Sequence, residues 1–352
     1  MDFALSEEQQ GLAQAASQIM DSVVTHEHLT ELEGQGWSVF DRALWQQLAD
    51  GGVLGAVVPE EHGGSGLGIT ALLGVLEAAG RTVAPVPLIP TLVLGALPIA
   101  RFGNTEQQAR LLPGVVGGSV ILTAALEDPQ VSADSGRLTG EALQVPYAPH
   151  ATHLLVAAAG AVWIVDPTAE GVGIVEQQTT NHQPIGDVLL DGAPAEVLTA
   201  DPDAPRWMAE MGAAAICALQ AGVCEGALRM TAKHTSNRKQ FDKPIAEFQA
   251  VAQRAADAYI DTEMVRLTAW QALFRLGEGW PASNEVHVAK FWAGEGGMRA
   301  LHAAQHLHGG LGVDTSYPLH RYFLWGKQNE HTLGTPTREL LRLGTALADE
   351  PV

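Results

Sequence analysis

Six short apolar runs in the middle of the chain, between two long stretches with helical periodicity, constrain the fold most. The runs are SVILTAAL, VPYAP, HLLVAAAG, AVWIVDP, GVGIVEQ and DVLLDG, with Gly, Pro, Asp and Asn between them. Short apolar runs separated by such turn-forming residues are typical of antiparallel strands. The rest of the chain has helical spacing. We therefore expect an α+β protein with an N-terminal helical domain (1–118), a middle antiparallel β domain (119–200) and a C-terminal helical bundle (201–352).

Local signals place several helices in the first domain. Ser6 and Gln9 form a plausible capping box for a helix over 3–24. Further helices are expected over 41–50 and 69–81, and over 106–112 with Thr105 as its cap. The glycine-rich loop 55–68 lacks both GxGxxG and a Lys-Ser/Thr pair, so it is expected to be a turn and not a phosphate loop.

Charge and cysteine content narrow the function classes. The net charge of -20 argues against nucleic acid as the main partner. Cys217 and Cys224 lie on one expected helix, roughly 10 Å apart at helical rise, which is too far for a disulfide. The N-terminus has no signal-peptide core, and the most apolar runs are short or broken by proline. We expect a cytoplasmic protein with buried thiols and no membrane span.

The stretch RKQFDKPIAEFQAV, residues 238–251, has the composition of a ligand or subunit contact. Arg238 offers the bidentate donors that suit a pyrophosphate. Gln249 can donate to and accept from an adenosine or ribose edge, and Phe241 can pack beside an adenine. A plainer interpretation is that Arg238 and Lys239 stabilise a helix C-terminus.

Several ordered motifs resemble the acyl-CoA dehydrogenase family over nearly the whole chain. They are FALSEEQQGLAQAA at the start, VVPEEHGGSGLG (57–68), FGNTEQQARLLPGVVGG (102–118), RKQFDKPIAEFQAV and AAQHLHGGLGV (303–313). Two departures stand out, because Asp242 replaces a family glycine and His306 occupies a glutamine position. The resemblance implies a helical domain, a β domain and a C-terminal four-helix bundle that drives oligomerisation. It also implies FAD, an acyl-CoA substrate and an electron-transfer flavoprotein as electron acceptor.

The resemblance assigns roles to individual residues. It implies that Arg238, Phe241 and Gln249 reach the FAD of an adjacent subunit, and that His306, Gly309, Gly310 and Gly312 complete that half-site. Glu330 lies at the position of the family's catalytic base, followed by His331 where glycine is usual and by Thr332, which fits the cofactor-binding pattern. A second branch of the family carries its base on the helix that precedes RKQF. The aligned position in this chain is about Gly212, which largely excludes that alternative, although Glu210 is near.

The middle domain departs from the family pattern. The segment 125–138 stands where the family has a T-E-P-x-x-G-S-D loop, and only Glu127 matches it. The strand that stacks on the flavin ring is replaced by VPYAPHATHL (145–154). The chain thus keeps the half-site for a neighbour but has weakened its own. This implies a subunit of an α2β2 heterotetramer whose homologous partner supplies the flavin wall, with a bulky, steroid side-chain CoA ester as substrate.

Other function classes stay open. The chain could be a self-sufficient homotetrameric dehydrogenase for short or branched acyl-CoA, or a non-catalytic partner of the same fold. His302 and His306 have the i, i+4 spacing that metal sites use, with His308 close by. No carboxylate or cysteine lies within that run, so we expect no metal site and no hydrolytic metalloprotein.

Overall fold

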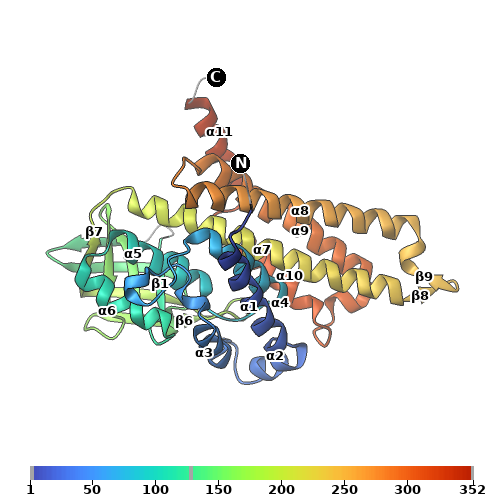
Figure 1. The fold of residues 1–352 in the computed structure, drawn as a ribbon, viewed down its shortest axis with the longest axis horizontal. Helices are drawn as coiled ribbons and strands as arrows, with labels where there is room; N and C mark the ends of the chain where they lie inside the picture. The colour runs from blue at the N-terminus through green and yellow to red at the C-terminus, as the bar shows by residue number, and fades with distance from the viewer. Residues whose placement is uncertain (1–3, 127–129, 350–352) are drawn as a thin grey trace.

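The computed structural model describes residues 4–126 and 130–349 (Figure 1). Its elements follow the predicted order of helices, strands and helices. Figure 1 shows the sheet at one end of the long axis and the tip of the C-terminal helices at the other. The element type changes after Val116 and again between Thr199 and Ala204. The α+β fold class is confirmed.

The N-terminal part is helical. The predicted capping box is present, because Ser6 Oγ accepts from Gln9 N and the Gln9 side chain accepts from Ser6 N. Thr105 is not a cap, however. Asn104 caps that helix and forms a capping box with Gln107, and the helix continues to Val116. The elements are α1 (Glu7–Val23), α2 (His26–Glu33), α3 (Arg42–Asp50), α4 (Leu72–Thr82), the π-helical η4 (Ile89–Ala96), α5 (Leu97–Phe102) and α6 (Thr105–Val116).

The middle part is a seven-stranded sheet in the order β1-β4-β5-β7-β3-β2, with β6 paired to β7. The sheet is mixed, which corrects the prediction of an antiparallel domain, because β1 and β4 run parallel. A β2–β3 excursion separates them along the chain, so β4 returns in the same direction as β1. The strands are β1 (Leu122–Ala125), β2 (Gln130–Asp134), β3 (Arg137–Pro146), β4 (His153–Ala158), β5 (Ala161–Val165), β6 (Val172–Gln177) and β7 (Ile185–Thr199).

The C-terminal part is built around one long helix, α7. Close packing joins it to α4, since a Cβ on Gly222 would lie 2.0 Å from the Glu77 carbonyl oxygen and one on Gly226 would lie 2.7 Å from that of Arg81. The elements are α7 (Ala204–Asn237), β8 (Lys239–Gln240), β9 (Lys243–Pro244), η6 (Ile245–Glu247), α8 (Gln249–Gly277), α9 (Ser283–His308), η7 (Gly309–Val313), α10 (Leu319–His331) and α11 (Pro336–Asp349).

Helix α7 is also long and apolar enough to cross a membrane. Of its most apolar window, 83% is buried inside the fold. Both Cys217 and Cys224 are free and lie in this buried part, where burial raises the pKa of each thiol to about 12. The helix therefore has the burial of a core element.

Hydrogen bonds from the first turn of helix α10 join this helix to the N-terminal part of the chain. The Arg321 guanidinium, only 5% exposed, contacts both carboxylate oxygens of Glu33 at 2.6–2.7 Å. Arg321 Nη1 also donates to His26 Nδ1. This contact fixes the helix whose other end forms the wall of the cavity described next.

Candidate functional site

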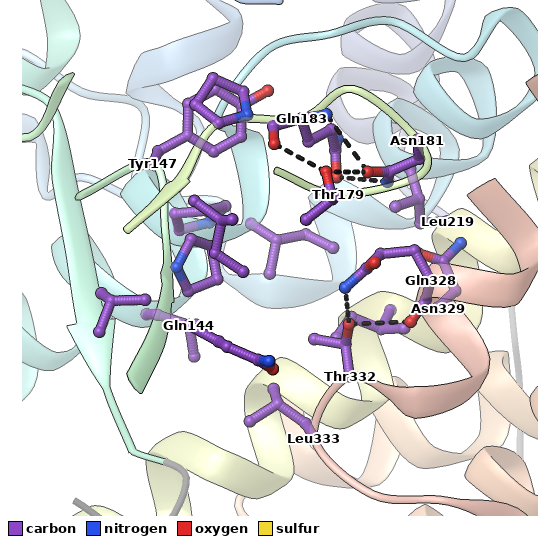
Figure 2. Close-up of a pocket in the computed structure, with 18 of the residues that line it drawn as sticks. Gln144, Tyr147, Thr179, Asn181, Gln183, Leu219, Gln328, Asn329, Thr332 and Leu333 are labelled. Atoms are coloured by element: carbon purple, nitrogen blue, oxygen red, sulfur yellow. Dashed lines mark hydrogen bonds between the residues drawn. The ribbon is translucent and has the colours of Figure 1, made fainter. Parts of the chain in front are cut away.

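A cavity of about 440 Å³ lies between the sheet and helices α4, α7 and α10 (Figure 2). Seven separate parts of the chain meet here, so no single local motif marks the cavity. The lining residues lie on α4, on the 84–94 segment, on the edge of β1 and the end of β3, on the loop 179–185, on α7 and on the last two turns of α10 with the residues after it. Its apolar walls are aliphatic for the most part.

One polar wall of the cavity is the loop 179–183, whose groups bond to one another. Thr179 Oγ1 donates to Asn181 Oδ1 (2.8 Å) and to the Gln183 carbonyl oxygen (2.9 Å). Asn181 Nδ2 donates to Gln183 Oε1 (3.0 Å), as Figure 2 shows. These contacts hold the loop in one arrangement and leave it neutral.

The opposite polar wall is the end of α10. Thr332 Oγ1 donates to the Gln328 carbonyl oxygen, and Asn329 Nδ2 donates to Gln220 Oε1 on α7. From behind, the buried Lys290 ammonium donates to the Asn329 carbonyl oxygen at 2.7 Å. A cation at a helix C-terminus is favourable. The predicted residue Thr332 is thus part of the cavity wall.

A bulge in β3 overhangs the cavity. Its pairing with β7 shifts register between Ala142 and Val145. Gln144 has φ +55, and its backbone N–H donates to Asp187 Oδ1. Leu143 is 56% exposed. Bulges re-aim side chains next to functional sites, and Figure 2 shows the Gln144 side chain directed across the cavity toward Leu333.

The described lining of the cavity has no acidic side chain and no lysine or arginine. Its titratable residues are Tyr147 and His331. Burial raises the pKa of Tyr147 and keeps its phenol neutral. A diphosphate would meet no cation here, and amides with aliphatic side chains do not form the flat wall that a flavin ring needs. These residues do not fit FAD. Glu127, the one match to the family loop, lies outside the described residues.

The predicted base, Glu330, is not among the residues that line the cavity. Its Oε2 lies 2.6 Å from Lys327 Nζ and 3.8 Å from His331 Nε2. The stem of its side chain lies beside Gly294 of α9. In this structure the carboxylate does not face the cavity, and the catalytic role of Glu330 stays a prediction.

The alternative base position is filled by apolar side chains. A Cβ on Gly212 would lie 2.6 Å from Leu333 Cδ1 and 2.7 Å from Leu94 Cδ2. Glu210 Oε1 accepts a hydrogen bond from Ser283 Oγ at 2.7 Å. A carboxylate at position 212 would therefore displace two leucines that line the cavity.

A second region, which we call the exposed half-site, is formed by Arg238, Phe241 and Gln249 with His306, Gly309 and Gly310. Arg238 is the C-cap residue of α7, and its backbone N–H donates to the His234 carbonyl oxygen. Its side chain is exposed and makes no hydrogen bond or ion pair within the described part of the chain. Phe241 sits at the tip of the β8–β9 hairpin, 87% exposed with φ +53. Gln249 is exposed in the first turn of α8. These side chains are available to a ligand outside this chain.

The other three residues lie where α9 ends. His306, Gly309 and Gly310 are exposed, and a Cβ on either glycine would meet no atom within 4 Å. The two helix ends are neighbours, because the rings of His234 on α7 and His308 on α9 stack with centroids 4.4 Å apart. The structure thus brings the two sequence-predicted segments to one end of the bundle, whereas Thr332 and Glu330 lie elsewhere.

The histidine run does not form a metal site in the part of the chain that the structure describes. His302 packs on Phe323, with ring centroids 5.0 Å apart. His308 is buried, with Nδ1 2.8 Å from the Ala304 carbonyl oxygen. His306 points to solvent. No group of three or more potential ligands occurs among the described residues.

Sequence reasoning missed the neutral polar side chains of the cavity wall, namely the amides Gln144, Asn181, Gln183, Gln328 and Asn329 and the hydroxyl of Thr179. Their one sequence signal is QTTNHQP (178–184), a polar cluster before the last strand. Such clusters usually mark plain loops, so the signal has low specificity.

Comparison with known proteins gives a consistent result. Residues 6–119 match the model for the N-terminal domain of acyl-CoA dehydrogenases, and residues 204–347 match that for their C-terminal domain. The chain is 40% identical to acyl-CoA dehydrogenase FadE27 of Mycobacterium tuberculosis, with 100% of each chain covered.

Two solved structures are similar over nearly the full length. The ChsE4–ChsE5 complex from Mycobacterium tuberculosis has a TM-score of 0.94 at 40% identity, with 100% of both chains covered. A variant of the Tcur3481–Tcur3483 steroid ACAD has a TM-score of 0.92 at 42% identity and covers 97% of this chain and 98% of that one.

Proposed function

Given that this chain belongs to the acyl-CoA dehydrogenase family, we propose that it is one subunit of a heterotetrameric, FAD-dependent acyl-CoA dehydrogenase. In this proposal the FAD lies at the interface with a homologous partner. The partner's β domain faces the flavin ring, and this chain contributes the exposed half-site.

The observation that carries the proposal is the difference between the two regions. The Arg238 side chain is exposed and has no partner among the described residues, while the described lining of the chain's own cavity has no lysine or arginine for a diphosphate. Leu219 lines the cavity and Arg238 ends the same helix, so roughly 30 Å of helix separates them. One chain cannot bring both regions to one cofactor, but two chains can.

The residues of this chain would bind and orient. Arg238 would give a pyrophosphate two parallel N–H donors, Gln249 would bond the adenosine or ribose edge, and Phe241 would pack beside the adenine. The open backbone at Gly309 and Gly310 would let a phosphate approach, with His306 donating one hydrogen bond. When bound, the flavin supplies the acceptor for the hydride that leaves Cβ of the acyl group.

A bulky, steroid side-chain CoA ester is the substrate that we propose. The support is indirect: one similar structure is described as a steroid ACAD, and it shares 42% of its residues with this chain. An electron-transfer flavoprotein is proposed as electron acceptor, as is usual in the family, and the compartment is proposed to be the cytoplasm.

The position of Glu330 bears on which subunit holds the base. Removing an α proton needs a carboxylate within hydrogen-bond reach of it, whereas Glu330 is paired with Lys327 outside the cavity. We therefore favour a heteromer in which the partner supplies the base. A self-sufficient homotetramer would need a flavin wall and a carboxylate that the described cavity lining lacks.

Co-expression with a homologous acyl-CoA dehydrogenase chain tests the proposal. Native mass spectrometry of the product should show two copies of each chain with FAD, and the complex should oxidise a steroid side-chain CoA ester faster than butyryl-CoA. A homotetramer of this chain that carries FAD and oxidises either substrate would refute the heteromer.

A further inference from the structure

The cavity between the sheet and α10 has no occupant in the function proposed above. We infer that it is a binding site for an uncharged, predominantly aliphatic molecule that carries at least one hydroxyl or carbonyl oxygen. Its volume of about 440 Å³ lies within the roughly 300–1,000 Å³ of small-molecule sites. Its apolar floor is formed by residues such as Leu76, Val86, Leu88, Ile89, Leu94 and Ile216.

The lining selects against charge. A buried carboxylate or phosphate without a partner carries a large desolvation penalty, and no described lining residue is Lys or Arg. The loop 179–183 and the end of α10 present amides and hydroxyls that already bond to one another. Two neutral polar walls around an aliphatic floor therefore favour a neutral ligand over a CoA ester or a dinucleotide.

Gln144 supplies the polar contact. Its side-chain amide makes no hydrogen bond within the described residues, while its backbone is held at φ +55 by the bulge and by Asp187. Residues kept in sparsely populated backbone regions cluster at ligand sites. Figure 2 shows this side chain reaching over the cavity, where an amide can donate to or accept from a hydroxyl or carbonyl oxygen.

This inference rests on the proposed function in one respect, which is that flavin does not fill the cavity. A rigid steroid ketone and a flexible fatty alcohol share the required chemistry, so both serve as probes. The probes are androst-4-ene-3,17-dione and dodecan-1-ol, and dodecanoate is the charged match of the alcohol. Calorimetric titration of the full-length chain, in the assembly in which it purifies, gives affinity and stoichiometry.

We expect at least one neutral probe to bind at one site per chain, and dodecanoate to bind at least about tenfold more weakly because its charge is unpaired. Binding of the steroid alone identifies a rigid ring system as the ligand, and binding of the alcohol alone identifies an acyl-like chain. Failure of both neutral probes, or equal binding of dodecanoate, would overturn the inference.

Three variants locate the site. Leu219→Trp adds volume inside the cavity, and Leu143→Asp adds a charge at its mouth; each should weaken binding at least about tenfold. Leu189→Asp is the matched control, since Leu189 is a 41% exposed leucine of the same sheet that does not line the cavity. It should change binding less than about twofold. Equal loss in all three variants would place the probe elsewhere.

Flavin content is measured on the same samples. Stoichiometric FAD in the chain without a partner would contradict the proposed function and this inference together. A flavin-loaded heteromer that binds no neutral probe contradicts this inference alone.

Discussion

The exposed half-site and the cavity differ in whether their polar side chains have hydrogen-bond partners within this chain. In the cavity, Thr179, Asn181 and Gln183 satisfy one another. At the half-site, the Arg238 side chain is exposed and makes no hydrogen bond or ion pair with the described residues, and Phe241 is 87% exposed. Among the described rings, Phe241 contacts only that of Phe248, in an edge-on arrangement, and a folded chain gains little by leaving an arginine and most of a phenylalanine in solvent. The contrast indicates that the half-site is completed by another molecule, whereas the polar groups of loop 179–183 are already paired within this chain.

Arg238→Ala gives the largest effect expected from this comparison. Loss of a charge-assisted hydrogen bond costs about 1.5–3 kcal/mol, so FAD should dissociate from the heteromer about 10- to 100-fold more readily. Flavin retention during dilution measures this. Arg206→Ala, an exposed arginine at the other end of α7, is the matched control and should retain FAD like the unmodified complex. Equal retention in both variants would mean that Arg238 does not touch the cofactor.

Gly310 is exposed in the half-site, whereas Gly312, two residues later, is buried. Substituting each glycine tests whether the exposed one contacts the cofactor. A Cβ on Gly310 meets no atom within 4 Å, whereas one on Gly312 would lie 2.6 Å from the Gln305 carbonyl oxygen. Gly312→Ala should therefore destabilise the chain by about 1–3 kcal/mol in denaturant titrations. Gly310→Ala should leave the stability within about 0.5 kcal/mol but weaken FAD binding in the heteromer. The half-site assignment fails if Gly310→Ala alters neither quantity.

The imidazoles beside the half-site give a smaller effect, on pH dependence. Burial lowers the pKa of His308, and burial with the nearby Arg238 charge lowers that of His234. A His whose folded pKa lies below its unfolded value of about 6.5 stabilises the fold fully above that value and progressively less as pH falls.

His308→Phe should therefore reduce the loss of unfolding free energy between roughly pH 7 and pH 5. The expected reduction is about 1 kcal/mol or less, measured by urea denaturation at both pH values. An unchanged pH dependence would show that His308 titrates alike in the folded and unfolded chain.

Glu330→Gln should have the smallest effect. Because the carboxylate is paired with Lys327 and does not face the cavity, kcat of the heteromer should change less than about twofold. If Glu330 were the general base, the loss would be about 10²- to 10⁴-fold. Steady-state kinetics of the heteromer decides between these values.

Local features of the fold could be predicted from the sequence, and pairings between distant segments could not. The capping box of Ser6 and Gln9 spans three residues, so the chain reveals it directly. The cap at Asn104 was missed by one residue, although the Asn104–Gln107 spacing gives the same signal. The parallel β1–β4 pair depends on how the chain returns after an excursion, which local periodicity does not encode.

The same limit applies to the two candidate sites. The half-site lies on two helix ends, and its residues follow from motifs. The cavity is formed by seven segments between Leu76 and Leu333. The sequence also could not predict which way the Glu330 side chain points. Asn329 lines the cavity, and the next residue along a helix is rotated by about 100° about the helix axis. Sequence places a residue on a helix but does not say which neighbour that face meets.

In the proposed heteromer, this chain completes a cofactor site without building one of its own. The direct test is the visible flavin absorbance of the chain purified alone and after co-expression with a homologous partner. We predict FAD well below one per chain in the first preparation and one FAD per pair of unlike chains in the second. Stoichiometric FAD with dehydrogenase activity in the lone chain would contradict the account.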